Sequence, residues 1–138
     1  MRINRLTHKS VKPYGCIIDS SFIKDDGRGD KFGVLLKERS SGWRIGYLIL
    51  RKKKIIRLEN HPDSLETFEP VRGRAIIALS ARKSPDQVKV FSLDKPVALK
   101  KRVWHNLAAV SKRCEIKIFE NIKVKTEYRA LKTAIMIK

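Results

Sequence analysis

Apolar residues recur along this chain in short runs rich in branched and aromatic side chains, a pattern typical of β-strands. One run, WRIGYLIL, covers residues 43–50, and the basic stretch RKKK separates it from a second run, IIRL. We expect these two runs to pair as a hairpin with a basic turn. Further strands are expected in RGRAIIALSA, VKVFSL, CEIKIFENI and IKVKTEY.

Two of these runs differ in how their apolar residues are spaced. In CEIKIF, Ile116 and Ile118 alternate with Glu115 and Lys117, which is the period of a strand with one buried face. Residues 75–79 are instead apolar at successive positions. This predicts a strand that is covered on both sides, as at the centre of a sandwich or barrel.

Turn-forming residues punctuate the chain between the runs, at residues 25–30, 40–42, 61–64, 83–86 and 93–96. Many short strands at close spacing predict an all-β sandwich or barrel. A short helix is expected near residues 6–14 or in the tail after Tyr128. The stretch DDGRGD at residues 25–30 is expected to be a mobile surface loop.

The length and composition favour one ordinary globular domain. A chain of 138 residues suits a single core, so residues 1–138 are expected to form one domain. Its apolar runs are too short to cross a bilayer, and the start lacks a secretory segment, so we expect a cytoplasmic protein. Cys16 and Cys114 lie in apolar runs without CxxC spacing, which favours buried thiols over metal ligands, while a disulfide remains open.

The net charge adds a second candidate function. With 32 Lys and Arg against 14 Asp and Glu, the charge of +18 favours polyanions such as nucleic acid. The basic residues are spread along the chain, however, and only RKKK at residues 51–54 forms a run of four. Nucleic-acid binding is therefore an alternative and not the favoured function.

The candidate chemistry lies in residues 58–73, LENHPDSLETFEPVRG. Residues two apart on a strand point to the same side, so Glu59 and His61 can both face a barrel interior. Glu66 follows a turn and can return on the neighbouring strand. Imidazole and carboxylate groups together suit divalent zinc, nickel, manganese or iron. The alternatives are a turn histidine before Pro62 and an exposed carboxylate at Glu66.

The spacing of these residues resembles the first signature of the cupin barrels. That signature has two histidines separated by one residue, then a glutamate, then a glycine seven residues later. Here Glu59 replaces the first histidine, and His61, Glu66 and Gly73 match the rest. A second cupin signature supplies a further histidine, for which VWH offers His105. The resemblance implies a jelly-roll β-barrel with a possible metal site of Glu59, His61, Glu66 and His105.

A more specific resemblance extends over roughly residues 14–119. PYGCII, LENHP, FEPVRG and RVWHNL occur in the order and approximate spacing seen in the ureidoglycolate lyases, formerly called ureidoglycolate hydrolases, which are cupin enzymes of allantoin breakdown. The resemblance implies cleavage of ureidoglycolate to glyoxylate and urea. His61, Glu66 and His105 would then be the catalytic residues, because a carboxylate and a histidine in one cavity can move the protons of that reaction.

This sequence differs from the ureidoglycolate lyase family at positions close to the candidate site residues. The family tends to have arginine in place of Asn60, a small hydroxyl residue and glutamine in place of Leu65 and Glu66, and histidine in place of Lys100. An arginine would hold a substrate carboxylate through two hydrogen bonds. The remaining candidates for this role are Lys100, Arg72, Arg74 and Arg102, although each could be an exposed strand-edge charge.

Three functions follow from these patterns. The favoured one is a cupin lyase acting on a small 2-hydroxy or 2-oxo acid. The alternatives are a small basic β-barrel that binds nucleic acid or another polyanion without catalysis, and a binder of sugars or small acids. A homodimer is also expected, because the apolar run AIMI at residues 134–137 could pair across a two-fold axis.

Overall fold

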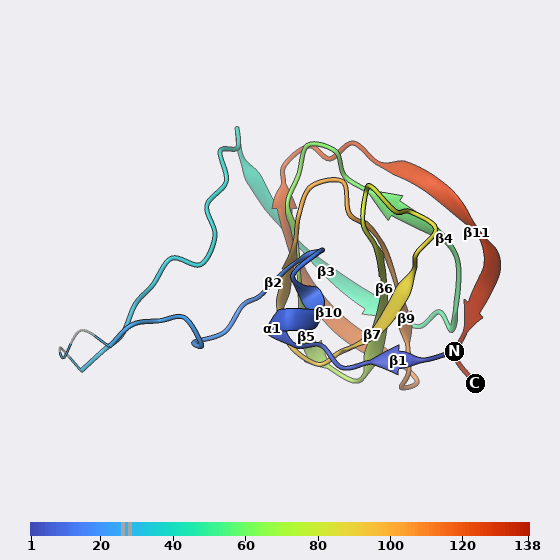
Figure 1. Cartoon of the computed structure of the whole chain (residues 1–138), viewed down its shortest axis with the longest axis horizontal. Helices are drawn as coiled ribbons and strands as arrows, with labels where there is room; N and C mark the ends of the chain where they lie inside the picture. Colours follow the sequence, from blue (N-terminus) through green and yellow to red (C-terminus); the bar gives the residue numbers. More distant parts are fainter. Residues whose placement is uncertain (26, 28) are drawn as a thin grey trace.

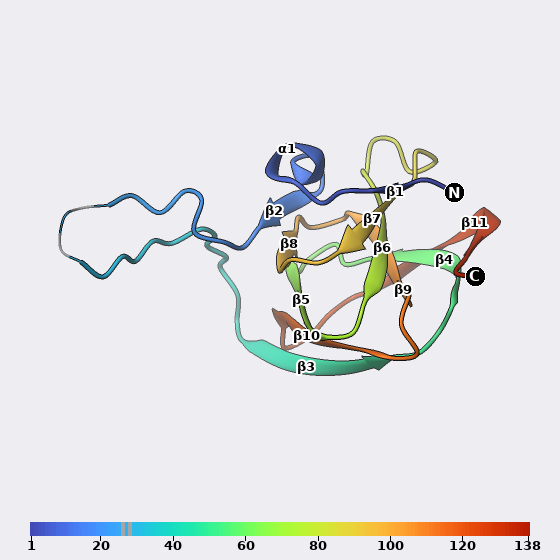
Figure 2. The same cartoon turned by 90° about the horizontal axis from the view of Figure 1, so that it is seen from below.

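The computed structural model describes residues 1–25, 27 and 29–138, and these residues fold into two facing β-sheets (Figures 1 and 2). The six-stranded sheet has the order β1 (Ile3–Asn4), β7 (Lys89–Leu93), β6 (Ala75–Ser80), β9 (Trp104–Ala109), β4 (Lys54–Asn60), β11 (Glu127–Met136). The five-stranded sheet has the order β2 (Gly15–Ile17), β8 (Val97–Leu99), β5 (Glu66–Arg72), β10 (Cys114–Asn121), β3 (Trp43–Leu50). The all-β fold expected from the sequence is confirmed.

Two apolar clusters explain why β6 is buried along its whole length. Ile77 and Leu79 pack into the main core between the sheets, together with Phe68 and Ile116 of the five-stranded sheet. The alternate residues Ile76 and Ala78 belong to a second cluster, which also contains residues of β4, β7 and β9 and is covered by Leu131, Ile135 and Ile137. Both faces of β6 are therefore covered, as its unbroken apolar run predicts.

The connections between strands differ from two sequence-based expectations. Residues 43–50 and 55–58 do form strands, but β3 pairs with β10, whereas β4 pairs with β9 and β11. The RKKK stretch therefore crosses from one sheet to the other, and the expected hairpin is wrong. Glu66 likewise returns on the facing sheet and not on a strand beside β4. Strand periodicity carries no information about which sheet a strand joins, so these pairings could not be seen in the pattern.

Helix is confined to one short segment of the described chain. The helix α1 (His8–Val11) begins after the capping residue Thr7, whose hydroxyl oxygen accepts a hydrogen bond from the Ser10 backbone. The tail after Tyr128 belongs to β11 and is not helical. Among the described residues, no helix has the length and apolar character needed to cross a membrane.

An arm that extends away from the barrel runs over the described residues of the range 18–42, which are 18–25, 27 and 29–42 (Figures 1 and 2). The outgoing and returning segments of the arm are in contact where the Ile23 side chain lies against Gly33. The arm carries strongly exposed aromatic side chains, with Phe22 exposed by 71% and Phe32 by 89%. The loop expected at residues 25–30 lies in this arm, and its residues 26 and 28 are outside the described chain.

Gly73 makes the tight connection between β5 and β6. Its φ of +77° is a left-handed conformation, and an added Cβ would lie 2.4 Å from the Arg113 carbonyl oxygen. We expect Gly73→Ala to lower the free energy of unfolding by at least about 2 kcal/mol, measured by urea denaturation. Gly46→Ala is the matched control, because a Cβ there meets Ile118 at an ordinary 3.8 Å. Equal stabilities of the two variants would contradict this.

Candidate metal and substrate site

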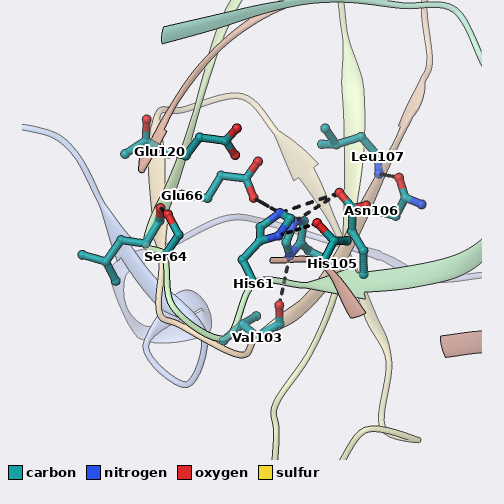
Figure 3. Close-up of polar contacts among 12 residues, drawn as sticks. His61, Ser64, Glu66, Val103, His105, Asn106, Leu107 and Glu120 are labelled. Atoms are coloured by element: carbon teal, nitrogen blue, oxygen red, sulfur yellow. Dashed lines mark hydrogen bonds and ion pairs between the residues drawn. The ribbon is translucent and has the colours of Figure 1, made fainter. Parts of the chain in front are cut away.

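The expected site residues converge between the two sheets. Glu59 of β4 lies directly opposite His105 of β9 in the six-stranded sheet, and His61 follows β4 immediately. Glu66 is the first residue of β5 and approaches from the five-stranded sheet. Figure 3 shows the side chains of Glu66, His61 and His105 directed toward one another. Segments far apart in the chain thus supply one compact group of polar side chains.

The shortest contacts of this group meet at one carboxylate oxygen. Glu66 Oε2 lies 2.8 Å from His61 Nε2 and 3.0 Å from His105 Nε2. Glu59 Oε1 lies farther away, at 3.9 Å from His61 Nε2 and 3.7 Å from His105 Nε2. The Glu66 and His105 side chains are 7% and 3% exposed, whereas Glu59 is 32% exposed. Glu59 is therefore the member of the group that solvent reaches most easily.

The outer nitrogens of both rings are held by backbone carbonyls. His61 Nδ1 lies 3.1 Å from the Lys125 carbonyl oxygen, and His105 Nδ1 lies 2.9 Å from the Val103 carbonyl oxygen. A carbonyl only accepts, so each Nδ1 donates its hydrogen outward. In the neutral rings, both Nε2 atoms then present lone pairs toward Glu66, a mutual repulsion that a cation between them would remove.

Two buried atoms of the group also lack well-aligned hydrogen bonds. Despite their short separation, Glu66 Oε2 and His105 Nε2 have no hydrogen-bond partner of acceptable geometry among the described residues. Buried polar atoms without partners are rare in folded proteins, and a bound ion would satisfy both atoms. Ligands about 2.0–2.2 Å from one metal ion lie roughly 3–3.5 Å apart, which is close to the separations here. The residues present therefore fit a divalent metal ion.

The contacts with histidine dominate the ionisation of Glu66. Burial alone would raise the pKa of Glu66, but contacts with His105 and His61 outweigh it and lower the pKa from 4.5 to about 2. Burial would likewise lower the pKa of His61, yet the Glu66 carboxylate produces a net increase. The arrangement thus favours an ionised Glu66 facing positive charge.

A second carboxyl group lies beside Glu66 in the five-stranded sheet. Glu120 of β10 is the cross-strand partner of Glu66 on one side and of Arg44 on the other. Burial raises the pKa of Glu120, and the Glu66 carboxylate adds to this while Arg44 opposes it. Arg44 Nε donates a hydrogen bond to Glu120 Oε2 at 2.8 Å. Among the described residues, two sets of donor atoms lie close enough together to hold a metal ion: Glu59, His61 and His105 form one, and His61, Glu66 and Glu120 form the other.

A cavity of about 510 Å³ leads to this group of residues. Glu59, Glu66 and His105 contribute to its lining, and Phe68 forms part of its apolar wall. The Phe68 ring meets the His105 ring edge-on, with 5.5 Å between their centroids. The volume lies in the range of small-molecule sites and would accommodate a small organic acid.

The cations expected to bind substrate lie elsewhere in the structure. The ammonium of Lys100 donates to the Lys12 carbonyl oxygen, and the exposed Arg72 approaches Glu115 at 3.9 Å. Arg102 has a positive φ of 68° and donates its backbone N–H to the His61 carbonyl oxygen. None of these three residues contributes to the lining of the 510 Å³ cavity. Arg102 instead lines a neighbouring hollow, together with Asn60.

Three basic residues that the sequence interpretation did not select do line the cavity: Arg51, Lys52 and Arg57. Two signals pointed to them. Arg51 and Lys52 belong to the longest basic run of the chain, and Arg57 shares the strand parity of Glu59. Burial lowers the pKa of Lys52, and nearby Glu59 opposes this. The next residue, Lys53, turns away and donates to the carbonyl oxygens of Ala109, Val110 and Ser111.

Comparisons with known proteins identify the fold. No protein-family model matches the chain, and no curated protein matches its sequence. A mutant of the 3,4-ketoisomerase QdtA from Thermoanaerobacterium thermosaccharolyticum aligns with a TM-score of 0.50 and 16% identity, over 62% of this chain and 64% of that one. A mutant of oxalate decarboxylase OxdC from Bacillus subtilis aligns with a TM-score of 0.50 and 11% identity, over 65% of this chain and 24% of that one. The shared architecture shows that the chain has the cupin fold.

Proposed function

We propose that the protein is a metal-dependent cupin enzyme that acts on a small 2-hydroxy or 2-oxo acid, and that its reaction is the cleavage of ureidoglycolate to glyoxylate and urea. The observation that carries the proposal is the convergence of His61, Glu66 and His105, with Glu59 beside them, at a cavity large enough for such an acid. The ureidoglycolate reaction rests on the sequence resemblance, which includes LENHP and RVWHNL. The fold is compatible with catalysis on small molecules, since a sugar 3,4-ketoisomerase and an oxalate decarboxylase share it.

His61, Glu66 and His105 would hold the metal ion, because their donor atoms lie closest together and both rings are fixed by backbone carbonyls. A bound divalent metal supplies Lewis acidity, which lowers the pKa of a coordinated hydroxyl group and polarises a carbonyl. Zinc, nickel, manganese and iron all suit imidazole and carboxylate donors.

Glu59 is suited to move the proton of the reaction. Ureidoglycolate has a hydroxyl group and a urea nitrogen on one carbon, so cleavage transfers one proton from that oxygen to that nitrogen. The Glu59 carboxylate takes the hydroxyl proton, the oxygen electrons form the glyoxylate carbonyl, and the carbon–nitrogen bond breaks. The same carboxyl group then gives its proton to the urea nitrogen. Its position in the cavity and its partial exposure fit this exchange.

The direct test is to follow urea and glyoxylate release from ureidoglycolate by purified protein whose metal content has been measured. We expect equal amounts of the two products, at least a 10-fold loss of rate after chelation, and recovery when one divalent metal is restored. Protein with bound metal that releases neither product would overturn the proposed reaction. Release that is unchanged after complete removal of metal would overturn the metal requirement.

A further inference from the structure

The loop that joins β3 to β4 is fixed against the strand that carries His105. The Lys52 carbonyl oxygen accepts a hydrogen bond from the Ala109 backbone at 2.8 Å. Lys53 donates to three carbonyl oxygens at the end of β9 and just beyond it. The loop therefore has a defined position at the cavity, even though its composition is that of an exposed basic run.

A single amide side chain organises the two cations nearest the site. Lys52 Nζ donates to Asn106 Oδ1 at 2.6 Å, and Asn106 Nδ2 donates to the Arg57 carbonyl oxygen at 2.8 Å. Asn106 directly follows His105 in β9, so both basic residues are tied to the strand that supplies a site histidine. The Arg57 guanidinium also lies 4.1 Å from the centroid of the Tyr128 ring.

The Lys52 ammonium retains bonding capacity in this position. An ammonium group has three hydrogens, and the Asn106 amide uses one of them. The negative charge of Glu59 lies near Lys52 and interacts with it electrostatically. Among the described residues, however, no ion pair within 4.0 Å joins the two side chains. A small anion could therefore accept hydrogen bonds from Lys52 without breaking a direct ion pair.

These cations line the same cavity as Glu59, Glu66 and His105, with apolar side chains including Leu48, Leu50 and Phe68 around them. Lys52, Arg57 and Arg51 outnumber the two carboxylates of the lining, Glu59 and Glu66, so the site favours an anionic ligand. We propose that Lys52, supported by Arg57 and Arg51, forms the subsite that binds the carboxylate of the substrate. This inference rests on the proposed function and names the substrate class as an organic acid.

The test measures how strongly the protein prefers an acid over its uncharged amide. Glycolate and glycolamide are titrated separately into metal-loaded protein by calorimetry, and the ratio of their Kd values gives the preference. We expect Lys52→Met to reduce this preference by about 10-fold or more, since hydrogen bonds between two charged groups are among the strongest in proteins. Lys54→Met is the matched control, because Lys54 is an exposed lysine at the start of β4 outside the cavity lining. The control should change the preference less than 2-fold.

Metal content and circular dichroism of each variant show whether the site and fold are intact. An unchanged preference in Lys52→Met, or wild-type protein with no preference for glycolate, would overturn the subsite. Loss of the preference in Lys52→Met alone would support it, even if wild-type protein releases no urea from ureidoglycolate. Conversely, the wild type could release urea while Lys52→Met keeps an unchanged preference for glycolate over glycolamide. That result would support the proposed reaction and show that Lys52 does not bind the substrate carboxylate.

Discussion

Replacing His61 with alanine is expected to lower kcat for ureidoglycolate cleavage by on the order of 10²–10⁴-fold and to weaken metal binding severely. The substitution removes one of the two ring nitrogens that meet Glu66 Oε2 and leaves that carboxylate buried with fewer positive partners. Steady-state rates and the ratio of metal to protein, measured on the same preparation, check both effects.

The chain contains its own control for this substitution. His8 is the histidine outside the site, where it contacts Asp19 at 3.0 Å and lies at the start of α1. His8→Ala should retain the rate and the metal content of the wild type. A His61→Ala variant with full metal content and an undiminished rate would show that the convergence of side chains has no part in catalysis.

In metal-free protein, Glu66→Gln is expected to lose on the order of 3 kcal/mol of stability relative to wild type at mildly acidic pH, where the histidine rings carry charge. The ionised Glu66 is stabilised by contacts with His105 and His61, which lower its pKa from 4.5 to about 2 although burial opposes this. A glutamine has no charge and cannot gain this stabilisation. Urea denaturation of chelator-treated protein at several pH values measures the difference.

The sign of the pH dependence follows from the lowered pKa. A carboxylate whose folded pKa lies below its unfolded pKa stabilises the fold above the unfolded value, here 4.5, and this stabilisation is lost as pH falls through about 2. The difference in the free energy of unfolding between wild type and Glu66→Gln should therefore be full between pH 4.5 and the ordinary histidine pKa of 6.5, and it should close as pH falls toward 2.

Glu69 provides the matched carboxylate in the same strand. The Glu69 carboxylate lies 3.5 Å from the Lys117 ammonium, and both side chains are about half exposed. Glu69→Gln should therefore cost little stability. If the difference in the free energy of unfolding between wild type and Glu66→Gln did not decrease toward low pH, Glu66 would not be held as a carboxylate in the folded protein.

The residues of the site were easier to predict from the sequence than the order of the strands in the sheets. Glu59, His61 and Glu66 lie within eight residues, and the intervals among them, together with His105 from RVWHNL, selected the side chains that meet in the fold. Such intervals carry information because alternation along a strand fixes which side chains share a face. The pairing of β3 with β10 depends on contacts across long sequence separations, and no local signal reports these.

The cations were harder to place than the histidines. Sequence proximity to the motifs favoured Lys100, Arg72 and Arg102, whereas the cavity lining contains Arg51, Lys52 and Arg57. The difference arises because the loop between β3 and β4 reaches the site by crossing between sheets. The calorimetric comparison of glycolate and glycolamide decides which basic residues bind substrate.

Two further expectations stay predictions. Nucleic-acid binding still has the charge of +18 in its favour, although Lys53 of the RKKK run is engaged by backbone carbonyls. The homodimer expected through residues 134–137 must accommodate the packing of Ile135 and Ile137 against the second cluster of their own chain. The exposed apolar side chains of β3, including Trp43 and Ile45, offer another surface for such contact.

The arm of residues 18–42 also has a consequence for engineering. The strands that precede it, β1 and β2, are held by pairing with β7 and β8, which follow it in the chain. The pairings of the N-terminal piece therefore do not depend on an unbroken chain through the arm. Two separately expressed fragments, divided within the arm, have the interactions needed to reassemble as a split protein. The group formed by Glu59, His61, Glu66 and His105 would then lie entirely in the larger fragment.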